Sequence, residues 1–166
     1  MKTSLRAVFS LGVVLSALFL SRFDASVSAQ TVQRPAQELL SAKEGEFLQF
    51  GQDFFDFAKS TRSTSPLESG AAEDLGTLSS ETADQLHAAQ ILLQISGDLT
   101  SPEDRARVFP LVETELLRYS REIGLSVEEV NLDIGYLEGS GVSAEASRMR
   151  DSLRQVRDAL GTIQVQ

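Results

Sequence analysis

The chain has 166 residues, of which 42% are hydrophobic, and it carries 24 acidic against 15 basic residues, one His, no Cys and no Trp. This composition suffices for one domain with an apolar core, and the lack of cysteine excludes disulfides, thiol catalysis and iron–sulfur sites. The net charge of −9 argues against nucleic acid as a partner, because proteins that bind it need clustered Lys and Arg to neutralise phosphates.

The first 29 residues have the pattern of a secretory signal peptide. Lys2 and Arg6 are basic, residues 7–20 form an apolar run, and the segment ends in Val27-Ser28-Ala29, which has small or compact residues where signal peptidase requires them. The apolar run is shorter than the roughly 20 residues that a membrane-spanning helix needs. We therefore predict cleavage after Ala29, with an uncleaved membrane anchor as the alternative.

Cleavage would remove three basic residues and one acidic residue, leaving 137 residues with a net charge of −11. The signal peptide predicts export to the periplasm or the extracellular space, with membrane contact only transiently through the signal peptide itself. An exported chain without Cys must be stabilised by core packing, which favours a helical bundle over a small disulfide-rich module.

Apolar residues recur at helical spacing along the remaining chain, and no segment alternates strictly as a strand does. The first helix is predicted over residues 36–59, where Leu40 and several phenylalanines share one face. Ser65-Pro66-Leu67-Glu68 has the pattern of a helix start with a capping box. The stretch that follows, to Ser80, contains two glycines and few large apolar residues, so we predict a short helix and then a loop.

Two further helices are predicted in the middle of the chain. The first covers about residues 81–96 and ends at Gly97 as a C-terminal cap. The second begins at the clear start signal Ser101-Pro102-Glu103-Asp104, runs to Ile123 and ends at Gly124.

The C-terminal third of the chain predicts a helical hairpin. A capping box at Ser126-Val127-Glu128-Glu129 restarts a helix that reaches Leu137, and Gly139-Ser140-Gly141 forms a tight turn before a last helix over residues 144–160. Together these segments predict an all-α bundle of four to five amphipathic helices, which occupies residues 30–166 as a single domain.

The sequence offers little for catalysis. His87 is the single histidine, with Asp84 and Glu81 before it at three-residue intervals. One histidine cannot supply the paired Glu-x-x-His motifs of a di-iron bundle, and nothing around it resembles the strained turn of a nucleophile. Glycine-rich phosphate loops, calcium loops and nucleophile elbows are also missing from the sequence. We therefore expect no enzymatic activity, no metal and no cofactor.

Five phenylalanines lie within eleven positions of the first helix: Phe47, Phe50, Phe54, Phe55 and Phe57. Such a cluster fits the core of a bundle, because aromatic side chains bury large areas. It also fits the wall of a cavity for a hydrophobic small molecule, and a kink expected near Pro110 in the third predicted helix is compatible with that use. Phe55 points to a different part of the helix surface from Phe50 and Phe57, so it is the candidate for an exposed contact.

The last helix is basic in an otherwise acidic chain. Residues 143–166 have a net charge of +1, whereas residues 30–142 have about −12. We expect Arg150, Arg154 and Arg157 to dock on acidic helices of the same molecule, with an anionic partner or a membrane surface as the alternative.

The functional expectation depends on the heptad-like apolar spacing of the last two helices, which also suits pairing with a helix of another chain. The sequence predicts an exported, non-enzymatic interaction or accessory factor of the cell envelope, which acts through contact with another protein or through self-association. The alternative is a small carrier that binds a hydrophobic ligand against the Phe-rich helix.

Overall fold

The computed structural model describes residues 30–163 and 165, with side chains from residue 35 onward. This part of the chain is all-helical, with no strand, and its four helices are α2 (Gln30–Thr61), α3 (Pro66–Asp98), α4 (Pro102–Tyr136) and α5 (Ser143–Thr162). The predicted all-α bundle is therefore confirmed, with four helices. The predicted signal peptide, residues 1–29, lies outside the described residues.

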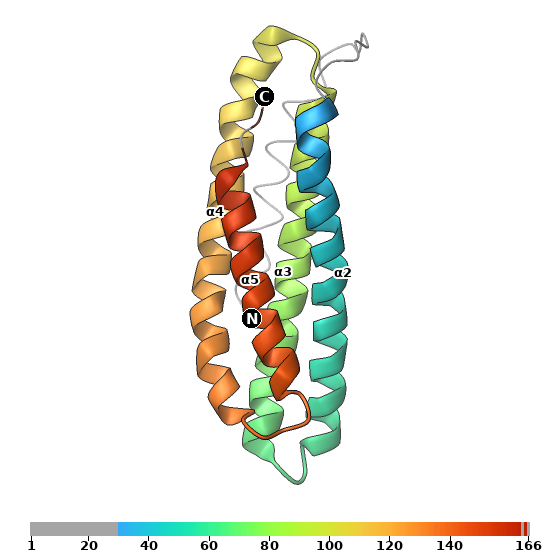
Figure 1. Cartoon of the computed structure of the whole chain (residues 1–166), viewed down its shortest axis with the longest axis vertical. Coiled ribbons are helices and arrows are strands. Elements are labelled where there is room, and N and C mark those ends of the chain that lie inside the picture. The colour runs from blue at the N-terminus through green and yellow to red at the C-terminus, as the bar shows by residue number, and fades with distance from the viewer. Residues whose placement is uncertain (1–29, 164, 166) are drawn as a thin grey trace.

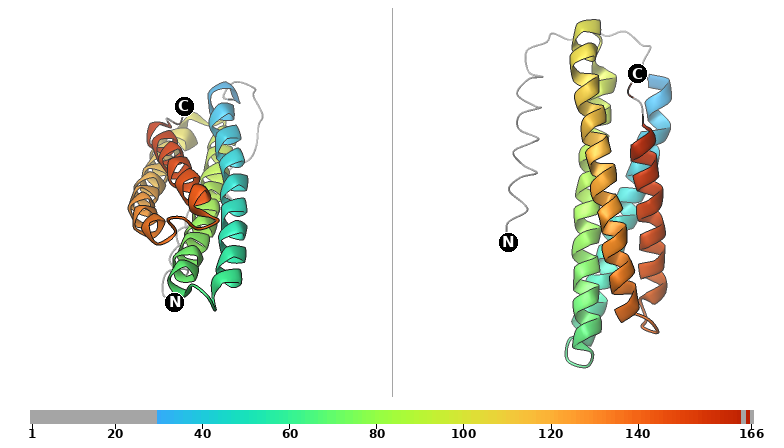
Figure 2. Two further views of the ribbon diagram at one scale, coloured as in Figure 1. Left: turned by 60° about the horizontal axis from the view of Figure 1, so that its bottom comes forward. Right: turned by 90° about the vertical axis from the view of Figure 1, so that its left-hand side faces the viewer.

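The four helices run alternately down and up along one long axis (Figure 1). α2 and α3 form one antiparallel pair and α4 and α5 the other, and contacts of α3 with α4 and of α2 with α5 join the two pairs. Of these four contacts, α2 with α3 is the most extensive. The right-hand view of Figure 2 shows α4 in front, between α3 and α5.

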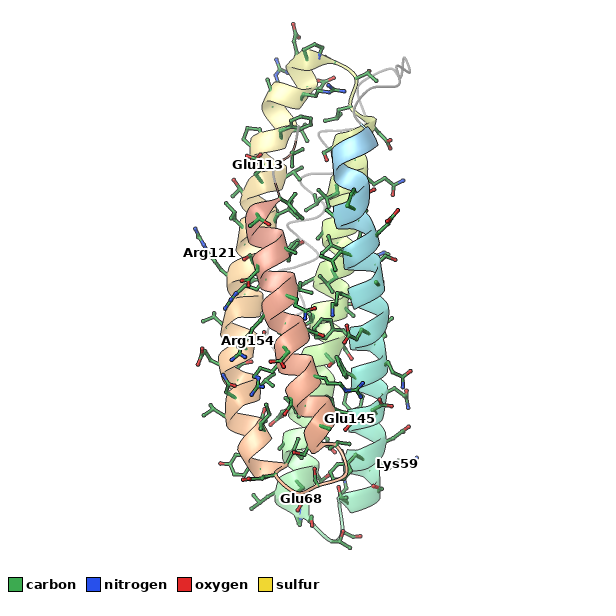
Figure 3. The ribbon with its side chains drawn as sticks, in the orientation of Figure 1. Lys59, Glu68, Glu113, Arg121, Glu145 and Arg154 are labelled. Atoms are coloured by element: carbon green, nitrogen blue, oxygen red, sulfur yellow. The ribbon has the colours of Figure 1, made fainter. Side chains whose placement is uncertain are left out.

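The helices enclose one hydrophobic core to which all four contribute. Its largest fully buried side chains are Phe47, Phe54, Leu40, Leu75, Leu86, Leu93, Leu116, Ile123, Leu137, Met149, Leu153 and Leu160. α5 is shorter than the other helices, and Val165, which lies beyond its end, also packs in the core. Val165 is buried, and its backbone N–H donates to Oε1 of Glu113 at 3.2 Å, near the upper end of α4 (Figure 3).

The loop predicted before Ser80 is wrong, because α3 is continuous from Pro66. Small side chains of its first half face α2 and allow the two helices to approach closely. Ser69 Oγ donates to the backbone oxygen of Ala58 at 2.9 Å, and a Cβ built on Gly51 would lie 3.5 Å from the backbone oxygen of Gly76. This packing stabilises the helix where intrinsic propensity is low, since most helical stability in proteins comes from tertiary contacts.

The helix ends predicted at Gly97 and Gly124 are also wrong. α3 continues to Asp98, and Gly97 does not adopt the left-handed backbone of a glycine cap. Residue 124 lies inside α4, where a Cβ would only touch the side chain of Arg157 at 3.5 Å. Ser126 does not cap a new helix, because its hydroxyl donates to the backbone oxygen of Glu122 at 3.3 Å within the same helix. The apolar stripe passes through this point unbroken, so burial outweighs the local stop and start signals.

The start of the first helix is also wrong, because α2 begins at Gln30, six residues before the predicted start, and has Pro35 within it. The remaining predicted boundaries match the structure to within two residues. Ser101 Oγ accepts from the backbone N–H of Asp104 at 3.4 Å, which is the expected N-cap. Ser65 precedes Pro66 as predicted, although its side chain forms no cap hydrogen bond. Gly139 has φ of +81° in the turn that joins α4 to α5, a conformation that glycine adopts without strain.

A polar cluster joins α2 to α5 across the bundle. Lys43 Nζ lies 2.6 Å from Glu46 Oε2 and donates to Ser152 Oγ at 3.0 Å. Ser152 Oγ in turn donates to Glu46 Oε1 at 2.8 Å, so each of the three groups contacts the other two. Because Ser152 is buried, its hydroxyl depends on these partners for its hydrogen bonds.

Replacing Ser152 with Ala should lower the free energy of unfolding by about 1 kcal/mol, because the two charged partners lose their shared hydroxyl. Urea unfolding measures the change. Ser147→Ala is the matched control on α5, since the Ser147 side chain forms no hydrogen bond within the described residues and Ala favours the helix slightly. Equal losses in the two variants would show that the cluster contributes nothing.

Candidate functional site

Three of the five clustered phenylalanines lie in the core. Phe47, Phe50 and Phe54 are buried, with ring centroids 5.9 Å apart for the first two and 6.4 Å for the last two. None of the three lines either of two surface grooves, one between α3 and α4 and the other between the end of α2 and α3. Their rings fill space between helices, as aromatic residues of a bundle core do.

The other two phenylalanines lie at the edge of the core. Phe57 is partly buried and packs against it. Phe55 is 41% exposed, and its ring covers Gly76, where a Cβ would be only 2.9 Å from the ring atoms. Phe55 also borders a shallow, open groove together with Lys59, Arg62, Glu73 and Thr77. Arg62 and Glu73 form a salt bridge there.

The candidate arginines of α5 pair with carboxylates of their own helix. Arg150 Nε lies 3.2 Å and Arg154 Nη1 3.3 Å from Asp151 Oδ1, and Arg157 Nη2 lies 2.7 Å from Asp158 Oδ1. Figure 3 labels Arg154. α5 docks instead through its apolar face, so the observed attachment of this helix does not depend on ion pairs from these three arginines to other helices.

His87 is exposed, and its Nδ1 lies 3.2 Å from Glu44 Oε1 of α2 rather than against Asp84. Among the described residues, no three His, Asp or Glu side chains lie close enough together to hold a metal ion. None of the helices in the described part of the chain combines the length and the apolar character needed to cross a bilayer.

The outer face of α4 carries large apolar side chains that nothing in the described chain covers. Leu125, Leu132 and Tyr136 are 68%, 73% and 59% exposed. Their spacing of seven and four residues places them within roughly 40° of one another around the helix. We call these three side chains the α4 ridge. The face opposite the ridge is buried in the bundle through Ile123, Val127 and Val130, so α4 is apolar on both sides here.

An open groove of about 340 Å³ lies between α3 and α4 and reaches the ridge at Leu132. It is lined by Asp74, Thr77, Leu78 and Glu81 of α3 and by Glu129, Leu132 and Asp133 of α4. Leu132 therefore belongs to both the ridge and the groove. Among the described residues, none of the four groove carboxylates forms a salt bridge or a side-chain hydrogen bond, whereas Glu115 and Glu122 farther along α4 are both paired with Arg118.

The carboxyl group of Asp133 lies in a partly buried site close to other carboxylates. Partial burial raises the pKa of its carboxyl group, and the nearby carboxylates of Asp74 and Glu129 raise it further. The native state therefore binds this proton more tightly than the unfolded chain does. The ionised carboxylate costs stability above its folded-state pKa, and the cost disappears as the pH falls through that pKa toward about 4.

Asp133→Asn should accordingly raise the free energy of unfolding at pH 7 by about 0.5 kcal/mol, a modest value because the groove is open to solvent. The gain should be smaller near pH 4, because protonation of the native carboxyl group removes the cost as the pH falls through its raised pKa. Urea unfolding at the two pH values tests this, with Glu128→Gln as a control on α4 outside the groove. A gain that grew on acidification would contradict the assignment.

The sequence pattern did not single out the ridge or the groove. The signal was available, since Leu125, Leu132 and Tyr136 fall on the face of α4 opposite its buried stripe. It was hidden by the helix end expected at Gly124, which divided the stripe between two shorter helices. No protein family model, curated protein or solved structure matches the chain, so its interpretation depends on its own residues.

Proposed function

We propose that this chain is an exported, non-enzymatic helical protein that acts by binding another protein in the periplasm or the extracellular space. The single observation that supports binding is the α4 ridge. Leu125, Leu132 and Tyr136 are exposed in a helix whose opposite face already fills the core. Exposed apolar side chains gathered along a polar-rimmed groove are typical of surfaces that bind protein partners.

The absence of catalysis is part of the proposal and is based on the sequence. The single histidine, His87, lies on the surface in contact with one carboxylate of α2, and the grooves of the described chain hold no His at all. Export is supported by the basic, apolar and small-residue segments of residues 1–29. The mass of the intact protein from culture fractions tests it: a chain that begins at Gln30 is expected, and a chain that keeps Met1 contradicts cleavage.

Site-specific photo-crosslinking tests the binding function. A photoreactive amino acid at position 132 should give a discrete heavier adduct in the compartment where the protein resides. Position 48 on α2 is the matched control, because Leu48 is also an exposed leucine in the middle of a helix. An adduct from position 132 alone supports a partner at the ridge. No adduct, or the same adducts from both positions, overturns the proposal.

A further inference from the structure

The helical segments that line the groove contain no basic residue. The neighbouring groove, which shares Thr77 with it, is bordered by Lys59 and Arg62, and Arg62 is paired with Glu73. α3 has no Lys or Arg anywhere along its length, and neither does the chain from residue 122 to residue 142. The same two segments contain eleven Asp and Glu residues. A surface with charge of one sign attracts partners of the opposite sign and repels those of the same sign.

The ridge offers exposed apolar side chains that a partner helix can contact. Its spacing of seven and four residues is the spacing by which one helix packs along another. Leu132 lines the groove, and all three ridge side chains are exposed on the outside of the bundle. Leu78 and Leu132 are the apolar lining of the groove itself, between Asp74 and Glu81 on one wall and the α4 carboxylates on the other. Apolar anchors flanked by unpaired carboxylates fit a helix that has leucine-like side chains on one face and basic ones at its margins.

The charges also argue against the other occupants. A second copy of this chain is itself strongly acidic, and its α5 arginines are already paired with Asp151 and Asp158. An anionic lipid surface or a nucleic acid would meet the same repulsion.

We propose that the ridge and groove bind a cationic amphipathic helix of another protein. Apolar side chains of that helix would contact Leu125, Leu132 and Tyr136, and its Lys or Arg side chains would contact Asp74, Glu129 and Asp133. This inference rests on the proposed function and specifies the chemistry of the partner. It gives the unpaired carboxylates of the groove a role that the fold does not give them, since partial burial and the neighbouring carboxylates together raise the pKa of Asp133 in the free protein.

A synthetic Leu–Lys peptide with heptad spacing is the probe, and a Leu–Glu peptide of the same pattern is its counterpart. Fluorescence titration of the exported protein should show binding of the Leu–Lys peptide only. The triple variant Asp74→Asn, Glu129→Gln and Asp133→Asn should weaken this binding at least about tenfold. Higher salt should weaken binding to the unmodified protein, because it screens charges near the surface.

The matched control is the triple variant Glu38→Gln, Asp53→Asn and Asp56→Asn, which removes three negative charges from the surface of α2. The two triple variants therefore have the same net charge as each other. It should change the affinity less than about twofold, since only the overall charge differs. The double variant Leu125→Gln and Leu132→Gln should also weaken binding about tenfold, and Leu48→Gln should leave it unchanged. Circular dichroism confirms that each variant is folded.

Equal losses in the two triple variants would overturn the inference, because general charge attraction would then explain the binding. Binding of the Leu–Glu peptide, or a dimer of this chain that dissociates on Leu132→Gln, would overturn it as well. These outcomes are separable from a failure of the proposed function, which is decided by the crosslink from position 132. Suppose that position 132 gives an adduct but that the triple variant of the groove binds the Leu–Lys peptide as tightly as the unmodified protein does. The proposed function would then be retained and the cationic partner rejected.

Discussion

Phe54→Ala is expected to lower the free energy of unfolding by about 4 kcal/mol, the usual cost of truncating a fully buried phenylalanine. The Phe54 side chain has no exposed surface, and its ring packs beside that of Phe50. Removing it takes apolar area out of the core and leaves a cavity that the surrounding helices can fill only in part. Urea unfolding of the purified protein measures the loss.

Phe55→Ala, at the next position, is the control. This ring is 41% exposed and lies over Gly76, so its removal should cost less than about 1 kcal/mol. Phe54→Leu is the milder variant if Phe54→Ala does not fold, and it should lose about 1 kcal/mol. Equal effects at positions 54 and 55 would contradict the placement of Phe54 in the core.

The same variants discriminate between core packing and a ligand carrier. A phenylalanine that borders a preformed, empty cavity has fewer packing partners, so its truncation in the ligand-free protein should cost well below 4 kcal/mol. Native mass spectrometry of the exported protein supplies the second measurement. A reproducible bound mass of lipid size, together with a small effect of Phe54→Ala, would favour the carrier over the interaction protein. A bare chain and a large effect would assign the Phe-rich helix to the core.

The helix starts at Ser65-Pro66 and Ser101-Pro102, the α4–α5 hairpin and the buried faces could be predicted because each depends on local chemistry. The Ser101-Pro102 start has its cap oxygen, its proline and its first-turn acids within four positions. The turn at Gly139 likewise depends on one residue with positive φ. Apolar periodicity then gives the inward face of each segment without knowledge of its neighbours.

Helix continuity through residues 70–80 and through Gly124 could not be predicted in the same way, because tertiary contact decides it. Glycine and serine lower helix propensity in isolation, yet at an interface they allow two backbones to approach. The candidate site has the same dependence. Asp74 and Asp133 are 59 positions apart in sequence, and only the packing of α3 against α4 brings them to one groove. No pattern within a single helix shows that they will repel one another.

Gly51→Leu is expected to lower the free energy of unfolding by about 3 kcal/mol, toward the upper end of the usual cost of overpacking. A Cβ at Gly51 would already lie 3.2 Å from Ser80 Oγ and 3.5 Å from the backbone oxygen of Gly76. The remaining atoms of a leucine side chain have no room between α2 and α3, so the two helices must separate. Urea unfolding measures the loss, and Gly51→Ala, in which only the Ser80 hydroxyl must shift, should be close to neutral.

Gly45→Leu on the same helix provides the matched control. Nothing lies within 4 Å of a Cβ at Gly45, so the variant should gain about 0.5 kcal/mol from the better helix propensity of leucine. Opposite signs for one substitution at two positions of α2 would separate tertiary contact from propensity. Hydrogen exchange then locates the contact: because α3 depends on α2 where its own propensity is low, Gly51→Leu should reduce amide protection most strongly in residues 70–80. A uniform loss of protection over all four helices would instead show that this stretch is helical without help from α2.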